Sequence, residues 1–310
     1  MAGGARELVV LGTGSQVPTR KRNQNGYLLH WDDDTILFDP GEGTQRQMLL
    51  ADTSYGRLSA ICITHFHGDH CLGLPGVLGR LVLDHHEGPV ELYFPASGAP
   101  YVERLRTSAV FDEFPNLHLV PVPLEGGEYD RRGYRLVARP LHHGVDTLGW
   151  RIEEPDRRHL LEDRLAAHGI VGPDVGKLVR AGRLETPAGT VTYEELSVPR
   201  RGQRFAFVMD TARCEGASEL AHGADLLVTE STFLEVDAPL AAAHLHLTAR
   251  QAGRLAADAG AGRLLLTHFS ARTPHEEQFA VEAATEHGDV VAARDLSRVA
   301  VGQAPESASS

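Results

Sequence analysis

The chain has 310 residues, of which 42% are hydrophobic and 23% charged, and its formal net charge is −12. This length and apolar content allow one substantial core, and no segment approaches the 18 consecutive apolar residues typical of a membrane-spanning helix. The first seven residues contain no apolar export signal, and the three cysteines lack the spacing of a disulfide framework or a thiolate zinc site. We therefore expect a soluble, cytoplasmic protein with no membrane partner.

Secondary structure is expected to alternate along the chain. Short β-like runs at residues 7–11, 27–31 and 35–39 are separated by glycine and aspartate turns, and residues 43–51 and 70–83 have helical apolar spacing that only Pro75 interrupts. Strands followed by helices recur in the second half. This order predicts an α/β fold class in which two mixed sheets lie between helices.

Residues 65–70, His-Phe-His-Gly-Asp-His, follow the apolar run 59–64 and place four potential metal ligands within six positions. Imidazole and carboxylate groups are accepted by Zn²⁺ and Mn²⁺, and Gly68 allows a tight turn. His65 and His67 could hold one ion, while Asp69 and His70 could serve a second, roughly 3.5–4 Å away as in two-metal hydrolytic sites. The segment therefore indicates a metallohydrolase.

Further ligands of the same types are expected at other strand ends, because the C-terminal ends of neighbouring strands meet at one edge of a sheet. Candidates follow three β-like runs: the pair His142-His143 after residues 134–139, Asp210 after residues 204–209, and His268 after residues 263–267. A single histidine after a strand is more often a hydrogen-bonded loop residue. Side-chain alternation allows only one of the two adjacent histidines to face a metal.

Together these segments resemble the ribonuclease Z family, the tRNA 3′-processing endonucleases of the metallo-β-lactamase superfamily. The histidine-aspartate segment alone indicates only the superfamily, whereas residues 230–233, Glu-Ser-Thr-Phe, and 246–249, His-Leu-Thr-Ala, are far more specific. The resemblance extends from about Leu8 to Arg298. It also includes residues 11–14, 18–20, 22–23, 38–45, 73–76, 143–145, 149–150, 209–211 and 267–270.

The resemblance implies an αββα metallo-β-lactamase sandwich over residues 1–302 that binds two Zn²⁺ per subunit, with Mn²⁺ or Fe²⁺ as alternatives. One metal would be held by His65, His67 and His143, the other by Asp69, His70 and His268, with Asp210 bridging them. Asp69 would also accept a proton from the attacking water. His246 would protonate the leaving oxygen with help from Glu230, although a solvent-facing position at a helix start is the plain alternative for His246.

Precursor tRNA is the substrate that the family implies. Residues 151–203 occupy the position of an inserted arm that grips tRNA, with Gly172, Pro173 and Lys177 as matching features, and the segment is electrically neutral despite the acidic chain. Ser270 and the basic residues Arg20, Lys21 and Arg22 are further expected RNA contacts, because helical RNA is recognised through its phosphates. An equally good interpretation is that Arg20, Lys21 and Arg22 are an ordinary run of solvated charges.

Some features depart from the family or leave alternatives open. Ala212 stands between Thr211 and Arg213, whereas relatives usually have an arginine directly after the threonine. Ala271-Arg272-Thr273 follows Ser270, where relatives usually have Arg-Tyr. The same metals could also hydrolyse a small phosphodiester, a sulfate ester or a lactone, and a non-catalytic RNA-binding protein is a third possibility. We expect a homodimer by resemblance and a disordered tail at residues 303–310.

Overall fold

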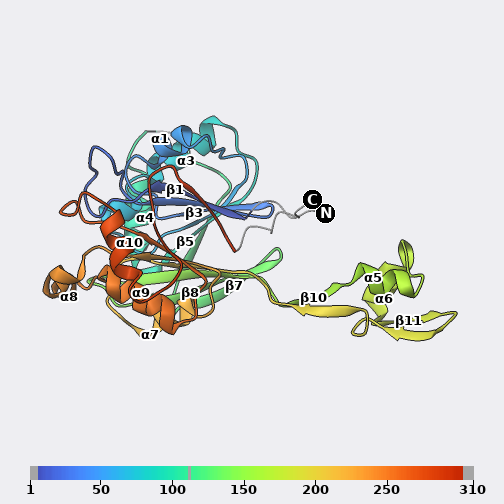
Figure 1. Ribbon diagram of the computed structural model, residues 1–310. Coiled ribbons are helices and arrows are strands. Elements are labelled where there is room, and N and C mark those ends of the chain that lie inside the picture. Colours follow the sequence, from blue (N-terminus) through green and yellow to red (C-terminus); the bar gives the residue numbers. More distant parts are fainter. Residues whose placement is uncertain (1–5, 111–112, 303–310) are drawn as a thin grey trace.

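The computed structural model describes residues 6–110 and 113–302, so the tail expected at 303–310 lies outside the described residues. Within these ranges two seven-stranded sheets face each other, and helices cover their outer faces (Figure 1). This is the αββα sandwich expected from the sequence. A narrow extension leaves the sandwich at one end.

The first sheet has the strand order β18-β1-β2-β3-β4-β5-β6. Its strands are β1 Glu7–Gly12, β2 Gly26–Trp31, β3 Asp34–Phe38, β4 Leu58–Cys62, β5 Val90–Pro95, β6 Leu117–Val122 and β18 Arg298–Ala300. From β3 to β6 neighbouring strands are parallel, and the others pair antiparallel. The helices of this half are α1 Thr44–Leu50, α2 Gly68–Cys71, α3 Leu74–Leu83, the 3₁₀ turn Ala96–Gly98 and α4 Ala99–Arg106.

The second sheet has the order β17-β16-β15-β14-β9-β8-β7. Its strands are β7 Gly127–Arg131, β8 Tyr134–Leu141, β9 Thr147–Glu153, β14 Arg204–Val208, β15 Leu226–Glu230, β16 Arg263–Thr267 and β17 Val290–Ala292. From β14 to β17 the strands are parallel, so their C-terminal ends share one edge. The helices are α7 Glu215–Ala221, the 3₁₀ turn Glu235–Asp237, α8 Ala238–His244, α9 Ala249–Asp258 and α10 Glu277–Ala283.

Aromatic side chains from both sheets fill the space between them. Tyr27 and Phe38 of the first sheet pack on Phe207 of the second, with ring centroids 5.1 and 4.8 Å apart. All three rings are fully buried. Because side chains alternate along a strand, their neighbours point to the outer faces, where two separate apolar clusters pack beneath the helices.

The expected helix at 70–83 is divided in the structure. Chain direction changes at Leu72 and Gly73 between α2 and α3, and Pro75 lies in the first turn of α3. A β-carbon on Gly73 would lie 2.0 Å from the carbonyl oxygen of Gly41, so this close approach requires glycine. The break allows α2 to remain beside the sheet edge while α3 covers its outer face.

The extension of the sandwich, hereafter the arm, consists of residues 157–200. Strands β10 Arg157–Leu160 and β13 Ser197–Arg200 form its stalk, and its tip carries α5 Glu162–Ala167, α6 Pro173–Ala181, β11 Arg183–Thr186 and β12 Gly189–Thr192 (Figure 1). A small apolar core centred on the fully buried Leu178 holds the tip together. The range expected from sequence, 151–203, is too wide, because residues 151–153 continue β9 in the sheet.

No helix in the described ranges has the length and apolar character needed to cross a bilayer.

Candidate metal centre

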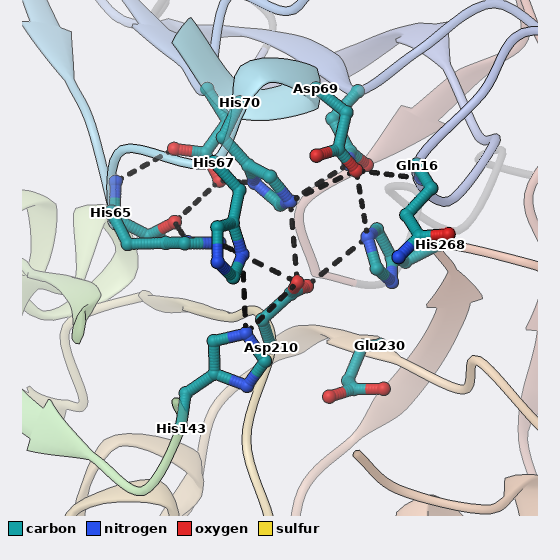
Figure 2. A network of polar contacts seen from close by, with 12 residues as sticks. Gln16, His65, His67, Asp69, His70, His143, Asp210, Glu230 and His268 are labelled. Carbon is teal, nitrogen blue, oxygen red and sulfur yellow. Dashed lines mark hydrogen bonds and ion pairs between the residues drawn. The ribbon is translucent and has the colours of Figure 1, made fainter. Parts of the chain in front are cut away.

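Histidine and aspartate side chains from both sheets meet at one edge of the sandwich. Eight of them form groups whose potential ligand atoms lie within 4.8 Å of one another. They are His246 and the seven expected metal ligands, His65, His67, Asp69, His70, His143, Asp210 and His268 (Figure 2). His65 and the segment 67–70 follow β4, while the other expected ligands follow β8, β14 and β16. Convergence of strand ends therefore positions these seven residues.

The seven expected ligands form two neighbouring groups. His65, His67, His143 and Asp210 form one group, and Asp69, His70 and His268 form the other. The Oδ2 atom of Asp210 lies 3.6 Å from Nε2 of His65 and 3.4 Å from Nε2 of His70, and Oδ1 lies 3.2 Å from Nε2 of His268. Asp210 thus faces both groups.

Hydrogen bonds behind the cluster fix which ring nitrogen of each histidine faces inward. Nδ1 of His70 lies 2.8 Å from the buried Asp39, Nδ1 of His65 lies 3.0 Å from the Thr64 hydroxyl, and Nδ1 of His143 lies 3.3 Å from the carbonyl of Leu245. Since these outer nitrogens donate, the Nε2 atoms carry lone pairs towards the centre. Such outer hydrogen bonds are the usual way in which proteins orient metal-binding histidines.

Two buried atoms at the centre show that the cluster fits cations. Asp210 Oδ1 and His268 Nε2 have no hydrogen-bond partner among the residues that the structure describes. The hydroxyl of Thr232 holds Nδ1 of His268 at 2.8 Å, so Nε2 directs a lone pair at the carboxylate oxygen. Two lone pairs facing each other at 3.2 Å are unfavourable unless positive charge lies between them.

Local electrostatics keep three of the imidazoles neutral and Asp210 ionised, which are the protonation states that metal ligands need. Burial lowers the pKa of three imidazoles and keeps them neutral, those of His65, His67 and His143. Burial opposes ionisation of Asp210, yet its interactions with the neighbouring His268 and His70 hold its pKa well below the usual value. Burial also opposes a charge on His70, whose pKa is nonetheless raised by the carboxylates of Asp210, Asp69 and Asp39. The site therefore concentrates negative charge that a cation would neutralise.

Several residues around the cluster have a left-handed backbone conformation that is uncommon outside glycine. They are Gln16, Asp39, Asp210, Leu245 and His268, with φ between 43° and 60°. Such conformations cost about 1–3 kcal/mol each and persist where the surrounding fold enforces them, often at functional sites. Asp39 and His268 directly follow strands β3 and β16, and Asp210 lies two residues after the end of β14, so the unusual φ bends the chain where each strand ends.

A second hydrogen-bond network joins Glu230 to the cluster. Glu230, at the end of β15, is fully buried and accepts from the Thr211 amide at 2.6 Å and from the Thr232 hydroxyl at 2.6 Å. Its Oε1 lies 2.9 Å from Nδ1 of His246. Burial lowers the pKa of His246, but the charge and hydrogen bond of Glu230 outweigh it and raise this pKa to about 9. His246 precedes α9, which begins after the cap Thr248, and His246 lies in the cleft rather than in solvent.

A cleft of about 900 Å³ opens onto the cluster. Loops from both sheets line it, including Gln16, Phe233, His246 and Ser270. The backbone amide of Gln16 donates to Asp69 Oδ2 at 2.7 Å (Figure 2). The side chain of Gln24 donates to the carbonyl of Gln16 at 2.8 Å and thereby holds the loop against the cleft.

The comparisons with known proteins agree with this geometry. The chain is 54% identical over 298 residues to ribonuclease Z of Streptomyces coelicolor, covering 96% of this chain and 98% of the relative. It is 53% identical to ribonuclease Z of Salinispora arenicola, with 96% of each chain covered. The chain belongs to the ribonuclease Z family.

Broader comparisons place the family in its superfamily. A family profile described as "Metallo-beta-lactamase superfamily" matches residues 19–196, and "Beta-lactamase superfamily domain" matches residues 183–269. The crystal structure of human tRNase Z, short form, superposes with a TM-score of 0.70 at 22% identity, covering 96% of this chain and 100% of the human one. A long-form RNase Z from yeast gives 0.68 at 16% identity and covers 96% of this chain and 42% of the yeast one. These solved structures share the fold.

The residues that the family resemblance suggested for RNA binding lie in three different surroundings. Ser270 lines the cleft, and Arg20 and Lys21 are exposed. Arg22 is only 6% exposed, and its guanidinium binds the carbonyl of Thr273 at 3.0 Å and Glu276 at 3.3 Å. The expected basic patch therefore lacks Arg22, which ties loops together instead. The remaining three lie on the arm: Gly172 and Pro173 are at the start of α6, and Lys177 is in its middle.

Sequence reasoning gave no role to three residues that support the cluster: Gln16, Asp39 and Thr232. Asp39 follows β3, so the strand-end rule that identified Asp210 could have found it. Thr232 belongs to the Glu-Ser-Thr-Phe segment, to which only the family resemblance draws attention. Gln16 contributes a backbone amide, and no side-chain pattern could have indicated it.

Proposed function

We propose that the protein is a metal-dependent endoribonuclease that removes the 3′ trailer from precursor tRNA by phosphodiester hydrolysis and leaves a 3′-hydroxyl on the tRNA. One observation carries the proposal: the seven-residue cluster, with its two unpartnered central atoms, opens onto a cleft in a chain that is more than half identical to ribonuclease Z enzymes.

Two divalent cations would be held in the two groups, the first by His65, His67 and His143, the second by Asp69, His70 and His268, with Asp210 between them. Zinc suits these ligands, and Mn²⁺ or Fe²⁺ accepts the same set. When bound, such a pair acts as a Lewis acid that lowers the pKa of water and neutralises charge on a phosphate.

Two residues would then move protons. Asp69, oriented by the amide of Gln16, would accept the proton of the attacking water. His246 would donate a proton to the leaving oxygen, because Glu230 favours its protonated form and leaves its second ring nitrogen available to the cleft. Glu230 is a positioning residue in this scheme.

Substrate binding would use the arm and the exposed residues beside the cleft, including Arg20, Lys21 and Ser270. The arm leaves the end of the sandwich opposite α8, whereas α8 lines the cleft (Figure 1). An arm that points away from its own cleft suits a homodimer in which it serves the partner's cleft, and we place this assembly in the cytoplasm.

The direct test incubates the purified protein with end-labelled precursor tRNA, with and without a chelator. We expect one metal-dependent cut at the junction of tRNA and trailer, and a tRNA product that can be oxidised by periodate because it ends in free hydroxyls. Absence of any chelator-sensitive cut in zinc, manganese or iron would refute the proposal.

A further inference from the structure

An aromatic stack lies beside the metal cluster on the outer side of the first sheet. Phe66 stands between the ligand-type residues His65 and His67 but turns the opposite way, where it packs against the outer apolar cluster and lies 6.2 Å from Phe94. A β-carbon on Gly98 would lie 1.9 Å from the Phe66 ring, so this glycine makes room for the ring. The contacts with Phe94 and with the backbone at Gly98 therefore hold the Phe66 ring in place.

Tyr101 of α4 extends the stack into solvent. Its ring lies nearly parallel to that of Phe66, with an interplanar angle of 21° and centroids 5.5 Å apart, and the residue is 49% exposed. The buried face of α4 is formed by Val102 and Leu105, so Tyr101 is not needed to anchor the helix.

Arg104 completes the surface. It stands one helical turn after Tyr101, and its guanidinium carbon lies 5.2 Å from the Tyr101 ring centroid. In the described part of the chain no carboxylate pairs with Arg104, whereas Arg106 of the same helix pairs with Glu103 and Glu113. The guanidinium of Arg104 stacks on the exposed ring of Tyr101, which in turn stacks on Phe66. This guanidinium is therefore available to a ligand.

We propose that Tyr101 and Arg104, supported by Phe66, form a platform that stacks an unpaired nucleotide of the RNA 3′ trailer. The proposal rests on the proposed function. Exposed aromatic rings and guanidinium planes bind single-stranded RNA because its bases offer free faces, whereas bases within a duplex are covered by their neighbours. The trailer is the single strand that leaves the cleavage point, and its phosphates suit the cationic member of the stack.

Position favours the trailer over other ligands. Phe66 directly precedes His67 in the sequence, and His67 is exposed and lines the cleft together with Leu72. The platform therefore begins just beyond the rim of the cleft. In Figure 1 α4 lies at the same end of the sandwich as α8, opposite the arm. An RNA strand passing out of the cleft over His67 would therefore reach Tyr101, whereas the arm would hold the body of a tRNA elsewhere.

Steady-state cleavage of precursor tRNA with a trailer of several nucleotides tests this placement. For Tyr101→Ala we expect KM to rise about tenfold, the scale of one lost base stack, with kcat changed less than twofold. Tyr101→Phe should keep the wild-type KM because the ring remains. Arg106→Ala is the matched control for Arg104→Ala: both remove one arginine from α4, and only Arg104→Ala should raise KM.

Two further measurements distinguish stacking from a general structural effect. Inhibition by mature tRNA, which lacks a trailer, should be equal for wild type and Tyr101→Ala. A precursor whose trailer nucleotides lack bases should raise the wild-type KM about tenfold, and Tyr101→Ala should add nothing further. An equal loss with normal and abasic trailers, or an unchanged KM, would overturn the platform, while failure of the wild type to cut any precursor would instead overturn the proposed function.

Discussion

The hydroxyl of Thr232 lies 2.8 Å from Nδ1 of His268 and donates its proton to Glu230 at 2.6 Å. Because that proton is donated to the carboxylate, the hydroxyl oxygen can only accept a hydrogen bond from His268. The proton of His268 is therefore on Nδ1, and the Nε2 atom that faces Asp210 carries a lone pair. One threonine thus connects the buried carboxylate that holds His246 with a proposed metal ligand.

Replacing Thr232 tests this connection. In Thr232→Val the side chain keeps its shape but can no longer accept from His268, so we expect metal affinity to fall about 10- to 100-fold, the usual effect of losing an outer hydrogen bond. Thr232→Ser should retain wild-type affinity. Zinc titration of the metal-stripped protein against a chromogenic chelator gives the values, and equal affinity for Val and wild type would contradict the role.

The adjacent histidines 142 and 143 provide a matched pair. His143 Nε2 lies 3.4 Å from Nδ1 of His67, whereas His142 is exposed and pairs with Ala212 through its backbone. We expect His143→Ala to reduce the number of zinc ions bound per chain and to abolish precursor cleavage. His142→Ala should change neither, and elemental analysis of both purified variants decides between them.

Metal removal should lower thermal stability. Without cations, the negative charge of the buried cluster is left without its counter-charge, and any ion that binds only the folded protein stabilises it by mass action. At a free zinc concentration 100 times the Kd the gain is about 2.7 kcal/mol. Differential scanning calorimetry with and without chelator measures it. A melting temperature that is the same in both conditions would show that the cluster holds no ion.

His246→Ala should slow the chemical step rather than weaken binding. Loss of a positioned proton donor typically reduces kcat by about 10²–10⁴-fold, and KM for precursor tRNA should change little. His244→Ala serves as control, because this histidine lines the same cleft but is exposed. A KM increase with unchanged kcat in His246→Ala would assign the residue to binding.

Deleting the arm separates RNA recognition from hydrolysis. Arg157 and Arg200 pair directly across the stalk, so a short glycine turn can replace the segment between them without straining β9 or β14. We expect loss of precursor cleavage with retained hydrolysis of a small chromogenic phosphodiester. Leu178→Ala, which should destabilise the core of the tip by about 2–5 kcal/mol, is a milder variant with the same expected direction. Retained precursor cleavage in both variants would instead favour a small-molecule hydrolase.

Local patterns in the sequence predicted two mixed sheets between helices and ligand-type residues at strand ends, and the resemblance to the ribonuclease Z family added the αββα sandwich and the choice of His143 over His142. Apolar runs that end in His or Asp predict strands that carry polar groups at one edge, and the short segment 65–70 contains four such groups. The same pattern could have predicted a role for Asp39, because this residue directly follows β3.

Only the tertiary structure decided how side chains distant in sequence face one another. The amide of Gln16 reaches Asp69, Arg22 is withdrawn from the surface by Glu276, and Thr232 links Glu230 to His268. These relations depend on backbone direction at strand ends, where φ becomes positive in residues other than glycine. Tertiary packing imposes that conformation against local preference, so no local pattern in the sequence can reveal it.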